Sequence, residues 1–246
     1  LLIPMMNRAG YDTNRSAGLI AAGGIIAPVI PPSIGFIVFG VAGNVSITKL
    51  FLAGIVPGIL MGVAIGIAWW IVARRDKVQA APRVPFGERL AITARGSLAL
   101  ALPVVIIGGM KFGIFTPTEA AVVAAVYSFV VGMFVYRELK PSMLYRLTLA
   151  AGKTTAVVMF LVAAAMVSAW LITVADIPGE VTRMLEPFMG NKTLLMLMMM
   201  VLIVIVGTAL DFTPTVLILT PVLMPVVLKA GIDPVYFGVL FIMNNA

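Results

Sequence analysis

Oxygen-bearing residues gather near the centre of a long apolar stretch, residues 193–228. Carboxylate, hydroxyl and backbone carbonyl oxygens are the ligands that small hard cations prefer, and a carboxylate within an apolar span is costly enough to mark a functional site by default. The pattern predicts an ion or substrate site, suited to a small cation. Its ligands would be Thr208, Asp211, Thr213, Thr215 and nearby backbone carbonyls. The structural alternative is a kinked hairpin whose aspartate is neutral or paired.

A second candidate lies at Pro31, Pro32 and Ser33, within the segment GGIIAPVIPPSIG. Proline removes a backbone donor and clashes with the preceding turn, so the span 17–42 is expected to break near Ser33. The half-helix ends at such a break can bind an ion. We therefore predict a site for an ion or an anion here, with a proline kink in a packed helix as the alternative.

The composition identifies an integral membrane protein. Hydrophobic residues make up 61% of the chain and charged residues only 11%, with a mean hydropathy of +1.12, which a soluble domain could not bury. The chain has neither Cys nor His, which removes disulfides and the usual zinc ligands and general base. The basic residues fall between apolar spans, so the net charge of +7 indicates orientation in a lipid bilayer and not nucleic-acid binding.

The stretch 193–228 is expected to be a re-entrant hairpin. Its two arms of 14 residues each would reach only about 21 Å, short of the roughly 30 Å hydrocarbon core. The remaining predicted elements are a broken helix 17–42, helices 50–73, 97–112, 118–136 and 154–175, and a truncated broken helix 235–246. Residues 1–73 would end a first repeat, whose opening residues finish a first hairpin, 74–96 would be a cytoplasmic basic connector, and 97–246 would form a second repeat.

Three local patterns supplement this outline. Glycines recur at every fourth position of helix 50–73, a spacing that lets another helix approach closely, at Gly54, Gly58, Gly62 and Gly66. Thr116 and Glu119 have the spacing of a capping box. Residues 177–192 form a short amphipathic segment, predicted to lie at the membrane surface.

The basic residues and an internal repeat predict the topology. If the turn 7–16, the connector 74–96 and the stretch 137–153 share one side, that side holds 12 of the 17 Lys and Arg residues and is cytoplasmic. Residues 4–12 and 225–233 share proline, a basic residue, Ala-Gly and Asp at equal spacing. These two turns would lie on opposite faces, as in the inverted repeats of secondary transporters. The predicted fold class is thus an all-α, inverted-repeat ion-transporter-type fold with broken transmembrane helices and re-entrant hairpins. In the same register Asn244-Asn245 matches Gly23-Gly24, which predicts a break there.

Several motifs together resemble the large membrane subunit of TRAP (tripartite ATP-independent periplasmic) transporters, the DctM-like family. They are AGYD with IPPS around 31–33, KLFLAGIVPGILMG at 49–62, GIFTPTEAA at 113–121 and GTALDFTPTVLILTPVLMPVVLKAGIDPVYFGV at 207–239. The resemblance implies a multi-pass protein of the bacterial cell inner membrane, not an enzyme, that works as a sodium-coupled elevator-type symporter. It implies Na+ as coupling ion and no other cofactor.

The resemblance also implies substrate, partners and sites. The substrate would be an organic acid, such as a C4-dicarboxylate, sialic acid or another sugar acid, delivered by a periplasmic substrate-binding protein. A small four-helix TRAP membrane subunit would be the scaffold partner. Carried over by position, Gly207, Thr208, Asp211, Thr213 and Thr215 would face sodium and substrate, and the break at residues 31–33 would complete another sodium site. The chain lacks the family's first hairpin and second broken helix, so by itself it is not expected to transport.

Three other functions remain as alternatives. The first is a sodium-coupled carboxylate transporter of a related inverted-repeat family, which works without a binding protein. A channel would pass currents beyond the turnover of any carrier. An intramembrane enzyme would need a second carboxylate or a nucleophile near Asp211, and the sequence has no other carboxylate at that depth.

Overall fold

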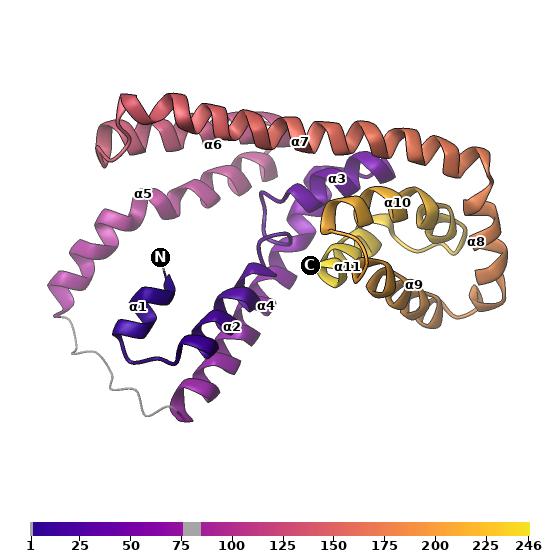
Figure 1. The fold of residues 1–246 in the computed structure, drawn as a ribbon, viewed down its shortest axis with the longest axis horizontal. Helices are drawn as coiled ribbons and strands as arrows, with labels where there is room; N and C mark the ends of the chain where they lie inside the picture. Colours follow the sequence, from indigo (N-terminus) through magenta and orange to yellow (C-terminus); the bar gives the residue numbers. More distant parts are fainter. Residues whose placement is uncertain (1, 76–84) are drawn as a thin grey trace.

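The computed structural model describes residues 2–75 and 85–246, and these form helices joined by turns, with no strand among them (Figure 1). Leu1 and residues 76–84, the middle of the predicted connector, lie outside the described part. The helices in order are α1 (Leu2–Arg8), α2 (Thr13–Gly24), α3 (Ile34–Gly43), α4 (Ile47–Arg75), α5 (Phe86–Lys111), α6 (Pro117–Val130), η1 (Val131–Val135), α7 (Pro141–Val174), α8 (Ile177–Leu185), η2 (Glu186–Phe188), α9 (Lys192–Gly207), α10 (Phe212–Lys229) and α11 (Pro234–Asn245).

By length and composition, four helices of the described part could cross a membrane: Ile47–Arg74, Pro117–Val135, Pro141–Val174 and Phe212–Lys229. A fifth span results if Phe86–Ala94 and Gly96–Lys111, which are bent by 51° relative to each other, count as one. The chain is therefore a multi-pass, all-helical membrane protein.

Two helices, α5 and α7, begin well before the apolar residues that predicted them. Helix α5 begins at Phe86, inside the predicted connector, and α7 begins at Pro141 instead of residue 154. Charged residues such as Arg and Lys are good helix formers, and proline favours the first helical position. A polar segment next to a span can therefore continue the helix, so that an apolar window underestimates its length. The capping box that starts α6 is confirmed, with Thr116 N–H donating to Glu119 Oε2 at 2.6 Å.

The broken helix consists of α2 and α3, with turns over residues 25–33 between them. Helix α2 begins four residues before the predicted span because Asp12 accepts a hydrogen bond from Arg15 N–H at 2.9 Å and caps it. Helix α3 begins after Ser33, whose side chain accepts a hydrogen bond from Phe36 N–H at 3.3 Å. The peptide bond between Pro31 and Pro32 is cis.

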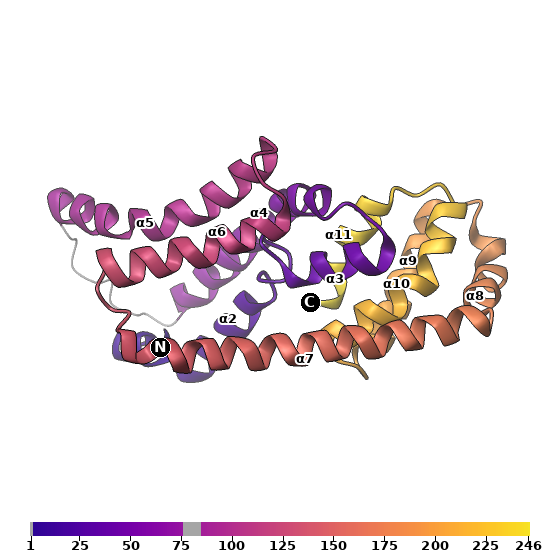
Figure 2. The same ribbon diagram turned by 90° about the horizontal axis from the view of Figure 1, so that it is seen from above.

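The repeated turns share one backbone conformation. Gly10 and Gly231, each just after a helix, have positive φ angles of 89° and 63°, which glycine adopts without strain. Asp12 and Asp233 each cap the next helix through a hydrogen bond to the backbone N–H three residues on, at 2.9 and 2.8 Å. Figures 1 and 2 place the α1–α2 turn and the α10–α11 turn toward opposite ends of the longest axis, the arrangement expected of an inverted repeat.

The other polar turns also lie at one or the other end of the longest axis. The end of α4, the beginning of α5 and the α6–α7 turn lie at the same end as the α1–α2 turn in both views (Figures 1 and 2). The α8–α9 and α10–α11 turns lie at the other end. The hairpin therefore enters from the end opposite the basic turns, which is the side that the charge distribution predicted for it.

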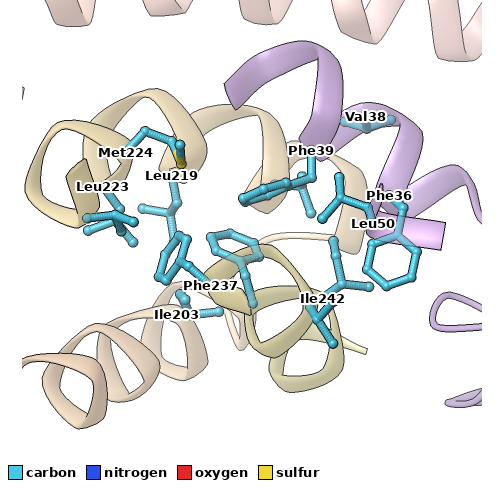
Figure 3. Close-up of a cluster of buried hydrophobic side chains, with 14 of the residues drawn as sticks. Phe36, Val38, Phe39, Leu50, Ile203, Leu219, Leu223, Met224, Phe237 and Ile242 are labelled. Carbon is cyan, nitrogen blue, oxygen red and sulfur yellow. The ribbon is translucent and has the colours of Figure 1, made fainter. Parts of the chain in front are cut away.

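The core forms where α3, α9, α10 and α11 meet (Figure 3). The rings of Phe39, Phe237 and Phe241 lie within 5.6 to 6.1 Å of one another, centroid to centroid, a favourable range for aromatic pairs. Helix α8 also contacts α10, and its apolar residues Val181 and Leu185 pack against this core. The segment predicted to lie at the membrane surface thus uses its apolar face to cover the hairpin.

The glycines of α4 differ in what they contact. A Cβ on Gly54 would lie 2.5 Å from Phe36 Cε2, and one on Gly58 would lie 2.5 Å from Ile30 Cγ1. Gly62 has only an ordinary contact, and Gly66 has no neighbour within 4 Å in the described part. The broken helix thus packs closely on α4 at Gly54 and Gly58, where the two cross.

Candidate functional site

The hairpin tip consists of residues 208–211, between α9 and α10. Both arms start from the end of the molecule that holds the α8–α9 and α10–α11 turns, and the tip points toward the middle of the longest axis, beside the end of α11 (Figures 1 and 2). The tip is therefore remote from both ends of the molecule.

The second arm starts earlier than predicted. Helix α10 begins at Phe212, so Thr213, Pro214 and Thr215 belong to its first turn and not to the tip. Proline fits there because the first backbone N–H groups of a helix have no partner within it. The arm has 18 residues and reaches about 27 Å, which is longer than predicted, but 56% of these residues are buried within the protein.

The tip presents unpaired backbone groups. Among the described residues, the carbonyl oxygens of residues 207–210 accept no hydrogen bond, and the backbone N–H groups of residues 211–213 donate none. The Asp211 carboxylate is exposed and has neither a capping hydrogen bond nor an ion pair in the described part. Oxygen acceptors thus lie next to amide donors at the positive end of a helix dipole, so the tip can bind both a cation and a carboxylate.

The three threonines play different parts. Thr208 Oγ1 donates to Ile205 O at 2.7 Å. Thr215 is fully buried, and its Oγ1 donates to Asp211 O at 2.9 Å. Thr213 is half-buried, and its hydroxyl has no hydrogen bond in the described part. Thr215 therefore supports the tip from within, whereas Thr208 and Thr213 lie on its accessible side.

Two asparagines contact the hairpin, a role that the sequence analysis did not assign to them. Asn245 Nδ2 donates to Phe212 O at 3.1 Å, and Asn244 Nδ2 donates to Met200 O at 2.9 Å. Helix α11 ends at Asn245, just as α2 ends at the matching Gly24, so a break directly after Asn245 stays a prediction. The asparagine side chains bond to neighbouring helices and so do not compete with the α11 backbone. The feature of the sequence that could have indicated this role is the pair of side-chain amides at the end of an apolar helix.

The break between α2 and α3 lies beside the tip. Pro31 and Ser33 are buried, and Pro32 is exposed. The Ser33 hydroxyl donates to Pro28 O and accepts from Phe36 N–H, so both of its roles are occupied within the break. A Cβ on Gly35 would come within 2.7 Å of Phe212 Cζ. The structure thus brings the two predicted sites into contact through Phe212.

Within the described ranges, no group of three or more His, Cys, Asp or Glu side chains could hold a metal ion. A cation at the tip would have one carboxylate, that of Asp211, together with hydroxyl and backbone oxygens. This set carries a single negative charge, which matches a monovalent cation such as Na+.

The broken helix, the hairpin and the membrane-length helices define a polytopic, all-helical membrane protein. The family profile described as "Tripartite ATP-independent periplasmic transporter, DctM component" matches residues 1–246. The chain belongs to this family of TRAP transporter large subunits.

Individual relatives agree with this assignment. The 2,3-diketo-L-gulonate TRAP transporter large permease protein YiaN of Escherichia coli is 54% identical over 99% of the chain and 57% of its own length. The C4-dicarboxylate TRAP transporter large permease protein DctM of Pseudomonas aeruginosa is 37% identical over 99% of the chain and 57% of its own length. The isethionate TRAP transporter permease protein DctMQ of Oleidesulfovibrio alaskensis is 37% identical over the whole chain and 39% of its own length. The chain therefore spans less than two thirds of each of these relatives.

Proposed function

We propose that this chain is part of the large transmembrane subunit of a sodium-coupled TRAP transporter that imports an organic acid into a bacterial cell. The observation that carries the proposal is the hairpin tip, where unpaired carbonyl oxygens and the Asp211 carboxylate adjoin unpaired amide groups. Membership of the TRAP large-subunit family supports it.

At this tip, sodium and substrate would bind next to each other. Sodium would take the oxygens of Gly207, Thr208 and Asp211, with Thr213 as a further ligand. The carboxylate of the substrate would accept hydrogen bonds from the amides at the start of α10, where the helix dipole favours negative charge. The bound cation offsets the charge of the anion, so each ligand strengthens the binding of the other. This coupling would link uptake to the sodium gradient.

An elevator movement is consistent with how the elements pack. The hairpin, α11 and α3 share one core, whereas α7 has no residue buried along its length. Two hollows of about 470 and 240 Å³, lined mainly by apolar side chains, lie between α7 and the helices α3 and α10, beside the contact that Val162 and Ala165 of α7 make with the core. We propose that the core elements move as one body along α7, carrying both ligands across the bilayer.

Two partners complete the proposal. A periplasmic substrate-binding protein would deliver the acid, and a small four-helix membrane subunit would extend the scaffold. The substrate class is an organic acid such as a C4-dicarboxylate, sialic acid or another sugar acid. Among these, the 54% identity with a permease named for 2,3-diketo-L-gulonate favours a sugar acid. The alternative is a carboxylate transporter that works without a binding protein.

Uptake by the full-length subunit tests the proposal. The subunit would be reconstituted in liposomes with its small subunit and binding protein, and uptake of labelled acids measured with and without an inward sodium gradient. Uptake should require both sodium and the binding protein, and Asp211→Asn should weaken its sodium dependence. Asp176→Asn is the control, because Asp176 is exposed, pairs with Arg183 and lies outside the tip. Uptake that needs no binding protein would favour the alternative, and uptake that is indifferent to sodium would contradict both.

A further inference from the structure

The end of α11 is attached to both arms of the hairpin by two adjacent side-chain amides. Asn244 bonds to Met200 in the middle of α9, and Asn245 bonds to Phe212 at the start of α10. Both asparagines are half-buried. A side-chain amide is well suited to such a contact because it offers a donor and an acceptor at once.

Asn245 contacts the hairpin on both sides of the tip. Its Nδ2 holds the carbonyl of Phe212, the first residue after the tip. Its Oδ1 faces Gly207, the last residue of the first arm, where a Cβ would come within 2.9 Å of it. A residue larger than glycine at position 207 would therefore displace the Asn245 side chain.

The residues that match Asn244 and Asn245 in the internal repeat carry no side-chain amide. In the common register of the two turns, Asn244 and Asn245 correspond to Gly23 and Gly24, which have no side chain to offer. Of the two matching pairs, only Asn244 and Asn245 thus carry side-chain amides.

We propose that Asn245 is a positioning residue of the hairpin tip, which fixes the spacing between the end of α9 and the start of α10 and thereby the affinity of the tip for sodium. The inference rests on the proposed function for its sodium readout. Its physical content is that the ligand oxygens of the tip are held in place before the cation arrives. Loss of the contact would leave them mobile, so that binding must first order them.

The test uses the full-length subunit with Asn245→Leu, which keeps the approximate size of the side chain and removes both polar groups. Asn244→Leu is the matched control, because it loses an equivalent hydrogen bond on the same helix but far from the tip. With Asn245→Leu, the sodium concentration for half-maximal uptake should rise about tenfold, as expected for the loss of one hydrogen bond, while the maximal rate at saturating sodium is retained. The control should leave the sodium dependence unchanged.

Two further measurements separate this inference from the proposed function. Hydrogen exchange of the peptide covering 205–216 should be faster in Asn245→Leu than in Asn244→Leu even without sodium. In a double-mutant cycle, Gly207→Ala should weaken sodium dependence in the wild type but add nothing in Asn245→Ala, because the side chain that the new methyl group displaces is absent there. Equal exchange in the two variants, or additive effects in the cycle, would overturn the inference. A wild type without sodium dependence would instead overturn the proposed function and leave the exchange experiment to decide the inference.

Discussion

The ring of Phe212 lies directly against Gly35, where a Cβ would come within 2.7 Å of Cζ. Phe212 follows Asp211 at the hairpin tip, and Gly35 lies in the first turn of α3, just after Ser33. The hairpin tip and the break between α2 and α3 therefore meet through one aromatic ring and one glycine. Any movement of the tip along the axis of the hairpin must therefore move this ring across the start of α3.

Gly35→Ala should therefore destabilise the protein. The added methyl group would push the Phe212 ring away, at a cost of about 1 to 3 kcal/mol for overpacking. Thermal unfolding of the full-length subunit in nanodiscs measures the effect. The second substitution Phe212→Leu should recover part of the loss, because the smaller side chain makes room for the methyl group. Purely additive effects of the two substitutions would show that the ring and the glycine are not coupled.

The sequence predicted the features that leave a local signal. Prolines and glycines around Ser33 indicated a break, and polar residues around Asp211 indicated the turn of a hairpin, because few residues tolerate these positions within an apolar helix. The repeated Ala-Gly and Asp predicted two equivalent turns, and the structure has the same hydrogen bonds in both.

Features that depend on distant neighbours could not be predicted in this way. Nothing in the local sequence around Asn245 indicates that its amide reaches Phe212, 33 positions away. The amphipathic pattern of α8 is the same whether its apolar face meets lipid or α10. The glycines of α4 form one regular series, yet only the position of the broken helix decides that Gly54 and Gly58 are contacts and Gly66 is not.

This difference among the glycines gives a second prediction. Gly54→Ala should destabilise the protein by about 1 to 3 kcal/mol, because its Cβ would also come within 2.7 Å of the backbone oxygen of Val29, which cannot move aside like a side chain. Gly66→Ala should change the stability by no more than about 1 kcal/mol, in the stabilising direction that helix propensity predicts. Thermal unfolding in nanodiscs compares the two. Similar losses at both positions would mean that another segment packs on Gly66 in the full-length subunit.

The predicted topology can be tested with cysteines, since the chain has none of its own. Gly190→Cys lies at the base of the hairpin, where a Cβ meets nothing within 4 Å, and Ser142→Cys lies at the exposed beginning of α7. In intact cells, with any cysteine outside these residues replaced, a membrane-impermeant maleimide should label the Gly190→Cys variant. It should label the Ser142→Cys variant only after permeabilisation. The reverse pattern would mean that the basic turns face the periplasm.

The last prediction concerns the support of the tip from within. Thr215 and Thr220 are both fully buried in α10, and each donates its hydroxyl to the carbonyl four residues earlier. Only Thr215 reaches the tip, because its acceptor is the carbonyl of Asp211. Thr215→Val and Thr220→Val keep the side-chain shape and remove one hydrogen bond each, so both should cost about 1 kcal/mol of stability.

Their effects on sodium should differ. Loss of the Thr215 hydroxyl bond leaves the Asp211 carbonyl with only the bond from Thr215 N–H. It should raise the sodium concentration for half-maximal uptake by about three- to tenfold, in line with one hydrogen bond. Loss of the Thr220 bond, more than a turn further along the helix, should leave it unchanged. If both variants shift the sodium dependence equally, the effect follows from general loosening of α10, and Asp211 does not depend on its link to Thr215. If only Thr215→Val shifts it, the geometry of the Asp211 backbone contributes directly to the affinity of the tip for the ion.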